Sequence, residues 1–243
     1  MTQRVALVSG ASRGLGAVIS RRLAAAGWAV AVSYRTDDAA ASAVVADIRA
    51  AGGVAEAIPG DVTDESAVSA LTARVVDQLG PVGLVVANAT GPQPTSALES
   101  MTWRAHLDQL EFFVKSPTLL VQAALPSMRR LGGGRVVLIG SDMADRALPG
   151  WSAYVAAKTA QIRLTRVWAK ELGPDRITVN LVAPGWIPVE RHAGADTSDY
   201  RADVPLGEMG TPDDIASMVA YLASDEAHFV TGQRITVNGG HTI

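Results

Sequence analysis

The chain has 243 residues, of which 48% are hydrophobic and 19% charged, with a formal net charge of −3. This length favours one large domain over two, and the small negative charge gives no reason to expect nucleic acid or an anionic membrane as partner. The chain contains no cysteine, which excludes disulfides and thiolate metal ligands, and no apolar run approaches the roughly 20 residues that span a bilayer. We therefore expect a cytosolic protein without a signal peptide.

The first predicted elements are a strand, a glycine-rich turn and a helix. Residues 4–9 form an apolar run, the glycines of 10–16 follow at once, and a helical pattern runs from 17 to 26. A dinucleotide-binding loop requires this order, because glycines let the backbone approach a pyrophosphate and the helix N-terminus offers unpaired N–H groups. The predicted nucleotide contacts of this turn are Gly10, Ser12, Arg13, Gly14, Leu15 and Gly16.

The second predicted strand, over 28–34, ends next to an arginine. An NAD site usually places a carboxylate near this point for the ribose 2′-hydroxyl, whereas an arginine suits the 2′-phosphate of NADP. Arg35 stands at the strand tip and Arg13 lies in the glycine-rich turn, so we favour NADP over NAD; the alternative for Arg35 is an ordinary exposed charge. Asp37 and Asp38 are expected to start the following helix.

Helical and strand patterns alternate through the rest of the chain. Helices are predicted over 39–51, 64–79, 99–130, from the region of Tyr154 to about 173, and 211–223; strands are predicted over 54–58, 81–87, 135–140, 176–182 and 233–237. Pro117 must start, kink or interrupt the long helical region. The alternation predicts an α/β fold, a single domain over 1–243 with a doubly wound, mostly parallel sheet and helices on both faces.

Ligands of such folds bind beyond the carboxyl ends of the strands. Ser141 follows the predicted strand 135–140 and precedes Tyr154 by thirteen residues, and Tyr154 and Lys158 are spaced to share one helix face. A phenol is a poor proton donor near neutral pH because its usual pKa is about 10, and a nearby ammonium lowers that pKa. Tyr154 is therefore a candidate general acid/base, unless it merely packs beside a solvated lysine.

The chain resembles the short-chain dehydrogenase/reductases from end to end, most closely their 3-oxoacyl-(acyl carrier protein) reductase branch. Ser9–Gly16 is similar to the TGxxxGxG loop, and Ser141, Tyr154 and Lys158 match the catalytic serine and YxxxK. Further motif matches are Asp61 and Val62 for the pair that touches adenine, Asn88 and Ala89 for NNAG, Asn180, Pro184, Gly185, Trp186 and Ile187 for the nicotinamide segment, and 231–233 and 237–240 for the C-terminal signature.

By this resemblance, NADPH delivers hydride to a ketone held by Ser141 and Tyr154, Tyr154 protonates the alkoxide, and Lys158 lowers the tyrosine pKa while binding the nicotinamide ribose. The substrate would be a small-molecule or acyl-thioester carbonyl, and the assembly a homotetramer or a dimer. Two alternatives stay open: an NADP-dependent alcohol dehydrogenase working in the oxidative direction, and a nucleotide-binding protein with impaired catalysis. A methyltransferase would leave Tyr154 and Lys158 unexplained.

Three positions depart from the family pattern. Phe113 stands where most members carry a catalytic asparagine, and the chain's only asparagines are Asn88, Asn180 and Asn238. Either Tyr154 is reprotonated by water through the backbone alone, or Phe113 reshapes the pocket for an unusual substrate, or catalysis has been lost. Val189 replaces a threonine that contacts the cofactor, and Thr90 adds bulk beside the nicotinamide.

The segment 186–203 has little periodicity and is predicted to be a mobile loop over the active site. Trp151, Trp186, Met143 and Leu148 could form an apolar substrate wall or ordinary core. The histidines at 106, 192, 228 and 241 show no metal-ligand spacing, so we predict no metal site and expect these side chains to be structural or exposed.

Overall fold

The fold is organised around one parallel sheet. The computed structural model describes residues 4–243, apart from the side chain of Arg191. The sheet has seven strands in the order β3-β2-β1-β4-β5-β6-β7, and each neighbouring pair is parallel. These strands are β1 Val5–Val8, β2 Ala29–Tyr34, β3 Ala55–Pro59, β4 Val82–Ala87, β5 Gly134–Ile139, β6 Ile177–Pro184 and β7 Arg234–Val237. The predicted α/β architecture is confirmed.

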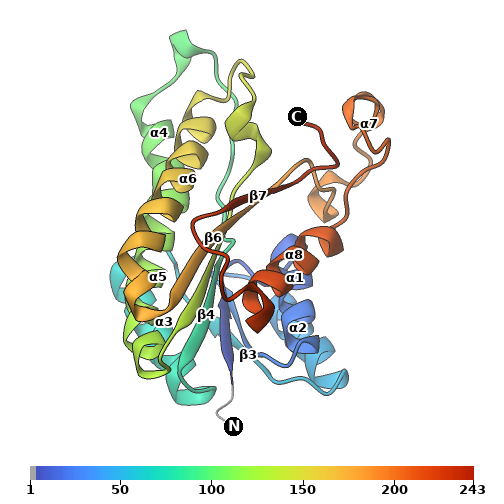
Figure 1. Cartoon of the computed structure of the whole chain (residues 1–243). Helices are drawn as coiled ribbons and strands as arrows, with labels where there is room; N and C mark the ends of the chain where they lie inside the picture. Colours follow the sequence, from blue (N-terminus) through green and yellow to red (C-terminus); the bar gives the residue numbers. More distant parts are fainter. Residues whose placement is uncertain (1–3) are drawn as a thin grey trace.

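Helices cover both faces of the sheet (Figure 1). One layer contains α1 Gly14–Ala25, α2 Asp38–Ala50 and α8 Pro212–Ala223, and the other contains α3 Glu65–Gln78, α5 Ser116–Arg130 and α6 Ser152–Leu172. All six residues of β4 are buried, as expected for a parallel strand covered on both sides. Two apolar cores result, one on each side of the sheet.

Local polar contacts explain where several helices begin. Asp37 accepts a hydrogen bond from the Ala40 N–H at the start of α2, and Asp64, one of two candidates from the sequence, does the same for α3. The prediction that Asp37 and Asp38 start a helix is thus confirmed. Helix α1 begins at Gly14 rather than at 17, because the last residues of the glycine-rich turn already form its first helical turn.

The structure divides two predicted segments further. The helical region expected over 99–130 consists of a 3-10 turn Leu98–Ser100, α4 Trp103–Leu110, a π-helical turn Glu111–Lys115 and α5, and Pro117 lies in the first turn of α5, as expected of a proline that starts, kinks or interrupts a helix. The predicted loop over 186–203 contains a 3-10 turn, Glu190–His192, and the short helix α7 Ser198–Asp203. No helix in residues 4–243 is both long and apolar enough to cross a membrane.

The strand order locates the functional edge. The strand order reverses between β1 and β4, because the chain continues from β1 to β2 and β3 on one side and from β4 to β5, β6 and β7 on the other. Such a reversal forms a crevice beyond the carboxyl ends of the strands. The glycine turn (Gly10–Gly16) follows β1, and the serine turn (Ser141–Asp145) follows β5. Gly16 and Ser141 are 125 residues apart in the sequence, and the fold brings their two turns to one edge of the sheet.

Candidate active site

A cavity of about 1270 Å³ lies at this edge, between the glycine turn and the serine turn. It is bordered by the ends of β1, β2, β4, β5 and β6 and by the start of α6. Every residue predicted for catalysis or cofactor contact lines it: Gly10, Ser12, Arg13, Gly14, Leu15, Gly16, Arg35, Asp61, Val62, Asn88, Ala89, Ser141, Tyr154, Lys158, Pro184, Gly185 and Ile187. Asn180, which the resemblance placed near the nicotinamide, lies instead within β6.

The glycine turn packs tightly against the end of β4. Gly10 has a φ of +62°, and a Cβ there would lie 2.8 Å from Ala89 Cα; a Cβ on Gly16 would lie 2.3 Å from the Gly10 carbonyl oxygen. The Asn88 amide donates hydrogen bonds to the Ser9 and Gly10 carbonyl oxygens. Asn88 therefore holds the glycine turn in place. The sequence predicted only a cofactor contact for this residue, not this structural role.

Two arginines lie where the second strand ends. Arg35 is 3.7 Å from a carboxylate oxygen of Asp61, and Arg13 is 3.9 Å from one of Asp37, with both guanidinium groups largely exposed. Burial tends to raise the pKa of Asp61, but hydrogen bonds from Thr63 outweigh this effect and hold that pKa below its ordinary value. This rim of the cavity thus combines two exposed guanidinium groups with the carboxyl groups of Asp37 and Asp61.

Ser141, Tyr154 and Lys158 line the same cavity, beyond the end of β5 and near the start of α6. The Ser141 hydroxyl oxygen accepts the Met143 N–H at 3.1 Å, and its own hydrogen is bonded to no described residue. Tyr154 lies one helical turn before Lys158 on α6, with the lysine Nζ 5.7 Å from its ring centroid. The predicted sharing of one helix face by the phenol and the amine agrees with this geometry.

Lys158 is buried, and its amine donates a 2.8 Å hydrogen bond to the Ile139 carbonyl oxygen. Burial lowers the pKa of this amine to about 7. The Nζ atom also lies 3.7 Å from the centroid of the Phe113 ring, and the negative face of an aromatic ring favours the charged form of lysine. These two influences oppose each other, so the amine is set to change charge near neutral pH.

Comparison with known proteins identifies the family of this chain. Residues 10–242 match a family model described as "Enoyl-(Acyl carrier protein) reductase". A "3-oxoacyl-[acyl-carrier-protein] reductase FabG" from Staphylococcus aureus is 38% identical over 244 residues, which cover 97% of this chain and 96% of the relative. The chain belongs to the short-chain dehydrogenase/reductase family. It is therefore a nicotinamide-dependent oxidoreductase of the kind that the sequence predicted.

Solved structures agree with this assignment. A "short-chain dehydrogenase/reductase from Serratia marcescens" is 34% identical, with a TM-score of 0.92 over 100% of this chain and 99% of that one. A "blue fluorescent protein from metagenomic library in complex with NADPH" is 37% identical, with a TM-score of 0.91 over 99% of this chain and 98% of that one. This short-chain dehydrogenase/reductase thus shares its whole architecture with both.

Phe113 packs against both Tyr154 and Lys158. It lies in the π-helical turn Glu111–Lys115, is 3% exposed, and does not reach the cavity. Its ring meets the Tyr154 ring edge-on at 5.4 Å, besides covering the Lys158 amine. The sequence did not predict this π-helical turn, in which one extra residue re-aims the side chains within a continuous helical region. Phe113 therefore contacts both Tyr154 and Lys158 without offering a hydrogen bond.

The substrate side of the cavity is an apolar wall with polar groups among it. Four apolar side chains were expected to form either a substrate wall or ordinary core. All four line the cavity and so belong to its wall: Trp151, Trp186, Met143 and Leu148. Arg146, His192 and Tyr200 also line the cavity; the sequence did not single out Arg146 or Tyr200, and His192 was expected to be structural or exposed. The Arg146 guanidinium lies 3.9 Å from the Met143 sulfur and forms no ion pair with a carboxylate among the described residues. Its proximity to Ser141 in the sequence was the one signal that could have suggested it.

Asn180 illustrates a residue whose predicted place was wrong. It is 1% exposed, its amide donates to the Val230 carbonyl oxygen at 2.7 Å, and its carbonyl accepts the Gln233 N–H at 3.1 Å. A buried amide needs such partners, since an unbonded one is costly. Asn180 therefore ties β6 to the segment that leads into β7 and does not line the cavity.

Proposed function

We propose that this protein reduces a ketone to a secondary alcohol with NADPH, and that Tyr154 is the general acid. The observation that carries the proposal is that Ser141, Tyr154 and Lys158 line the same cavity as the glycine turn. The substrate class that we infer is a 3-oxoacyl thioester or a related carbonyl compound, in line with the 38% identical reductase.

A dinucleotide fits the residues at the glycine-turn end. Helix α1 has no side-chain hydrogen bond at its N-cap, Arg13, so its first N–H groups are free to meet a pyrophosphate. Arg13 and Arg35 would flank a 2′-phosphate, which could replace their distant carboxylate partners at 3.9 and 3.7 Å. When bound, the reduced nicotinamide would supply the hydride. These features support NADPH over NADH, as does the NADPH complex of the metagenomic neighbour.

The protein's own contribution is to hold and protonate the ketone oxygen. Ser141 would donate its uncommitted hydroxyl hydrogen to that oxygen, and Tyr154 would transfer its phenolic proton as negative charge develops there. The Lys158 cation would stabilise the phenolate that remains. Donors that meet growing charge accelerate the reaction because they bind the transition state more strongly than the ground state.

The decisive experiment compares Tyr154→Phe with wild type. Turnover would be followed by NADPH absorbance with 3-oxoacyl thioesters of two chain lengths and with aromatic ketones. We expect a loss of about 10²- to 10⁴-fold, the range of general acid–base catalysis, while NADPH affinity changes little. Tyr221→Phe is the control, since Tyr221 is exposed on α8, away from the cavity lining. Undiminished turnover in Tyr154→Phe would refute the proposal.

The same assays distinguish the alternatives. Secondary alcohols with NADP test the oxidative direction, and NADPH binding without turnover of any substrate would favour a nucleotide-binding protein. We also propose self-association as a homotetramer or dimer, which the exposed side chains of Trp103 on α4 and Val167 on α6 support. Sedimentation of wild type against Trp103→Glu would test it, because a charge at a self-association surface should shift the mass toward monomer. The cytosolic location stays a prediction.

A further inference from the structure

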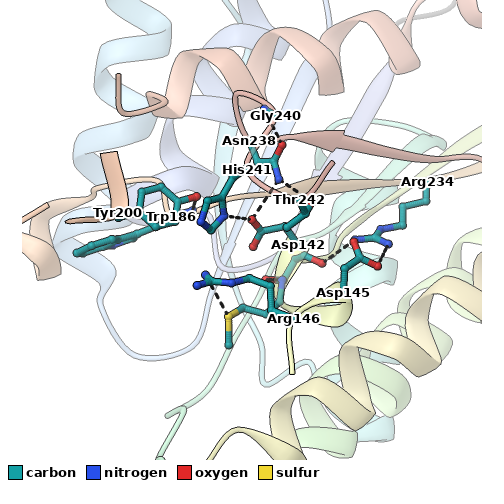
Figure 2. A network of polar contacts seen from close by, with 12 residues as sticks. Asp142, Asp145, Arg146, Trp186, Tyr200, Arg234, Asn238, Gly240, His241 and Thr242 are labelled. Atoms are coloured by element: carbon teal, nitrogen blue, oxygen red, sulfur yellow. Dashed lines mark hydrogen bonds and ion pairs between the residues drawn. The ribbon is translucent and has the colours of Figure 1, made fainter. Parts of the chain in front are cut away.

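A buried polar pair next to the catalytic serine takes no part in the mechanism above. Asp142 follows Ser141 directly, and His241 lies near the C-terminal end; their side chains are 3% and 5% exposed. His241 Nδ1 lies 3.2 Å from Asp142 Oδ2, and the Asn238 amide donates to the same oxygen at 3.2 Å (Figure 2). A buried carboxylate is costly unless it is hydrogen-bonded. The C-terminal segment supplies the donors that let Asp142 lie there.

The serine turn is held at a second point by β7. Arg234 Nη1 donates to Asp145 Oδ1 at 2.6 Å, and its Nη2 reaches the Ser141 carbonyl oxygen at 3.4 Å. The Arg234 side chain is only 16% exposed, which screens this pair less than a surface ion pair. Figure 2 shows both attachments reaching the turn from the same C-terminal part of the chain. The turn that carries Ser141 is therefore fixed by residues about 90 to 100 positions later.

The same histidine contacts the substrate-side segment (186–203). Its ring lies 4.3 Å from the Tyr200 ring, centroid to centroid, and the Tyr200 hydroxyl oxygen accepts the Trp186 N–H at 2.8 Å. The Trp186 and Tyr200 rings meet edge-on at 5.5 Å. Both Trp186 and Tyr200 line the cavity. His241 thus touches one residue of the serine turn and one residue of the opposite wall.

We propose that His241 and Asp142 are positioning residues that hold the serine turn and the substrate-side segment in one arrangement around the ketone. Neither residue touches the reacting atoms: Asp142 sets the backbone from which the Ser141 hydroxyl points, and His241 supports Tyr200 and, through it, Trp186. This proposal rests on the proposed function in one respect, that Ser141 holds the ketone oxygen. The coupling of the two walls is a property of the fold itself.

The test uses two substitutions of one residue. His241→Leu removes the donor to Asp142, whereas His241→Asn can place its amide nitrogen where Nδ1 lies, since both atoms are bonded to Cγ. We expect His241→Leu to lower kcat/KM for the ketone at least tenfold, mostly through a higher KM, with the Kd of NADPH within twofold of wild type. His241→Asn should recover most of that loss. His228→Leu is the matched control, because His228 bonds only the Asp225 backbone in an exposed turn.

A second measurement does not depend on turnover. Backbone hydrogen exchange should accelerate in peptides covering 141–146 and 185–201 of His241→Leu, and stay unchanged in the glycine turn and in His228→Leu. Exchange that rises uniformly over the chain would show a merely structural role and overturn the proposal, as would wild-type exchange in both peptides. If wild type reduces no ketone, the proposed function fails, but the exchange result still decides whether His241 couples the two walls.

Discussion

The two ends of the cavity are built in different ways. At the glycine-turn end the lining is mainly backbone, held by close packing on Ala89 and by the Asn88 amide. At the serine-turn end it consists of side chains from segments far apart in the chain, such as Trp151 and Tyr200. Backbone-built sites tolerate little change in shape, whereas side-chain walls can be altered one residue at a time. We therefore expect an added Cβ within the glycine turn to impair NADPH binding strongly, and substitutions in the side-chain wall at the second end to tune the reaction.

The largest expected effect is that of Gly16→Ala, which tests the difference between the two ends of the cavity most directly. Its Cβ would lie 2.3 Å from the Gly10 carbonyl oxygen and 2.6 Å from the Asn88 amide nitrogen, so the turn itself must move. Overpacking of this kind costs about 1–3 kcal/mol, and we expect a Tm several degrees lower and NADPH affinity reduced about 100-fold. Gly173→Ala, whose Cβ meets nothing within 4 Å, is the control. Full NADPH affinity in Gly16→Ala would show that the turn is not a rigid frame.

A smaller effect is expected from the arginines at the rim. Arg35→Ser should reduce NADPH affinity about tenfold and leave NADH affinity nearly unchanged, because only NADPH carries a 2′-phosphate and because an exposed charge is partly screened. Arg129→Ser, which breaks an exposed ion pair with Asp175, serves as the control for charge alone. Equal losses for both cofactors, measured by cofactor fluorescence, would mean that Arg35 does not read the phosphate.

At the serine-turn end, Phe113→Leu should shift a pH profile rather than abolish activity. Burial lowers the pKa of Lys158 to about 7, and the Phe113 ring face opposes that effect by favouring the cation. Without the ring the pKa falls further, by about one unit if the contact is worth about 1.4 kcal/mol. The cation is present below this pKa and lost above it, so reduction should decline as pH rises through it.

The measurement is kcat/KM for NADPH against pH, which reports ionisations of the free enzyme. We expect the declining limb of Phe113→Leu to lie about one pH unit below that of wild type. Phe112→Leu is the natural control, since the neighbouring Phe112 packs on Gly91 and lines the cavity without covering Lys158. If the declining limb of the pH profile lies at the same pH in Phe113→Leu and in wild type, Phe113 does not influence the pKa of the Lys158 amine.

The smallest effect concerns Val189, whose side chain lies beside Gly14. Val189→Thr is almost equal in volume and adds a hydroxyl, and one net hydrogen bond is worth about 1 kcal/mol. We therefore expect the Kd of NADPH to fall about threefold to fivefold. Calorimetric titration would measure the Kd. A higher Kd in Val189→Thr than in wild type would show that this side chain does not face the cofactor.

The comparison also explains what could be predicted from the sequence. The glycine turn, the Asp37 cap and the Tyr154–Lys158 pair are local patterns, in which spacing along the chain fixes spacing in space. Contacts between distant segments have no such pattern: Phe113 and Lys158 are 45 residues apart, and Asp142 and His241 are 99 apart. The π-helical turn was missed because it leaves helical residue preferences unchanged. Local spacing therefore predicted residues that line the cavity, Tyr154 and Lys158 among them, but not the contacts that surround them.

The burial of His241 has a practical consequence for handling the protein. His241, which contacts the Asp142 carboxylate, lies two residues before Ile243, so a sequence fused after Ile243 starts two residues from this contact. The described chain begins with Arg4, just before the amino end of β1, at the opposite edge of the sheet from the serine turn. An affinity tag is better placed there, and catalytic constants obtained with a carboxyl-terminal tag should be compared with those of the tag-free chain.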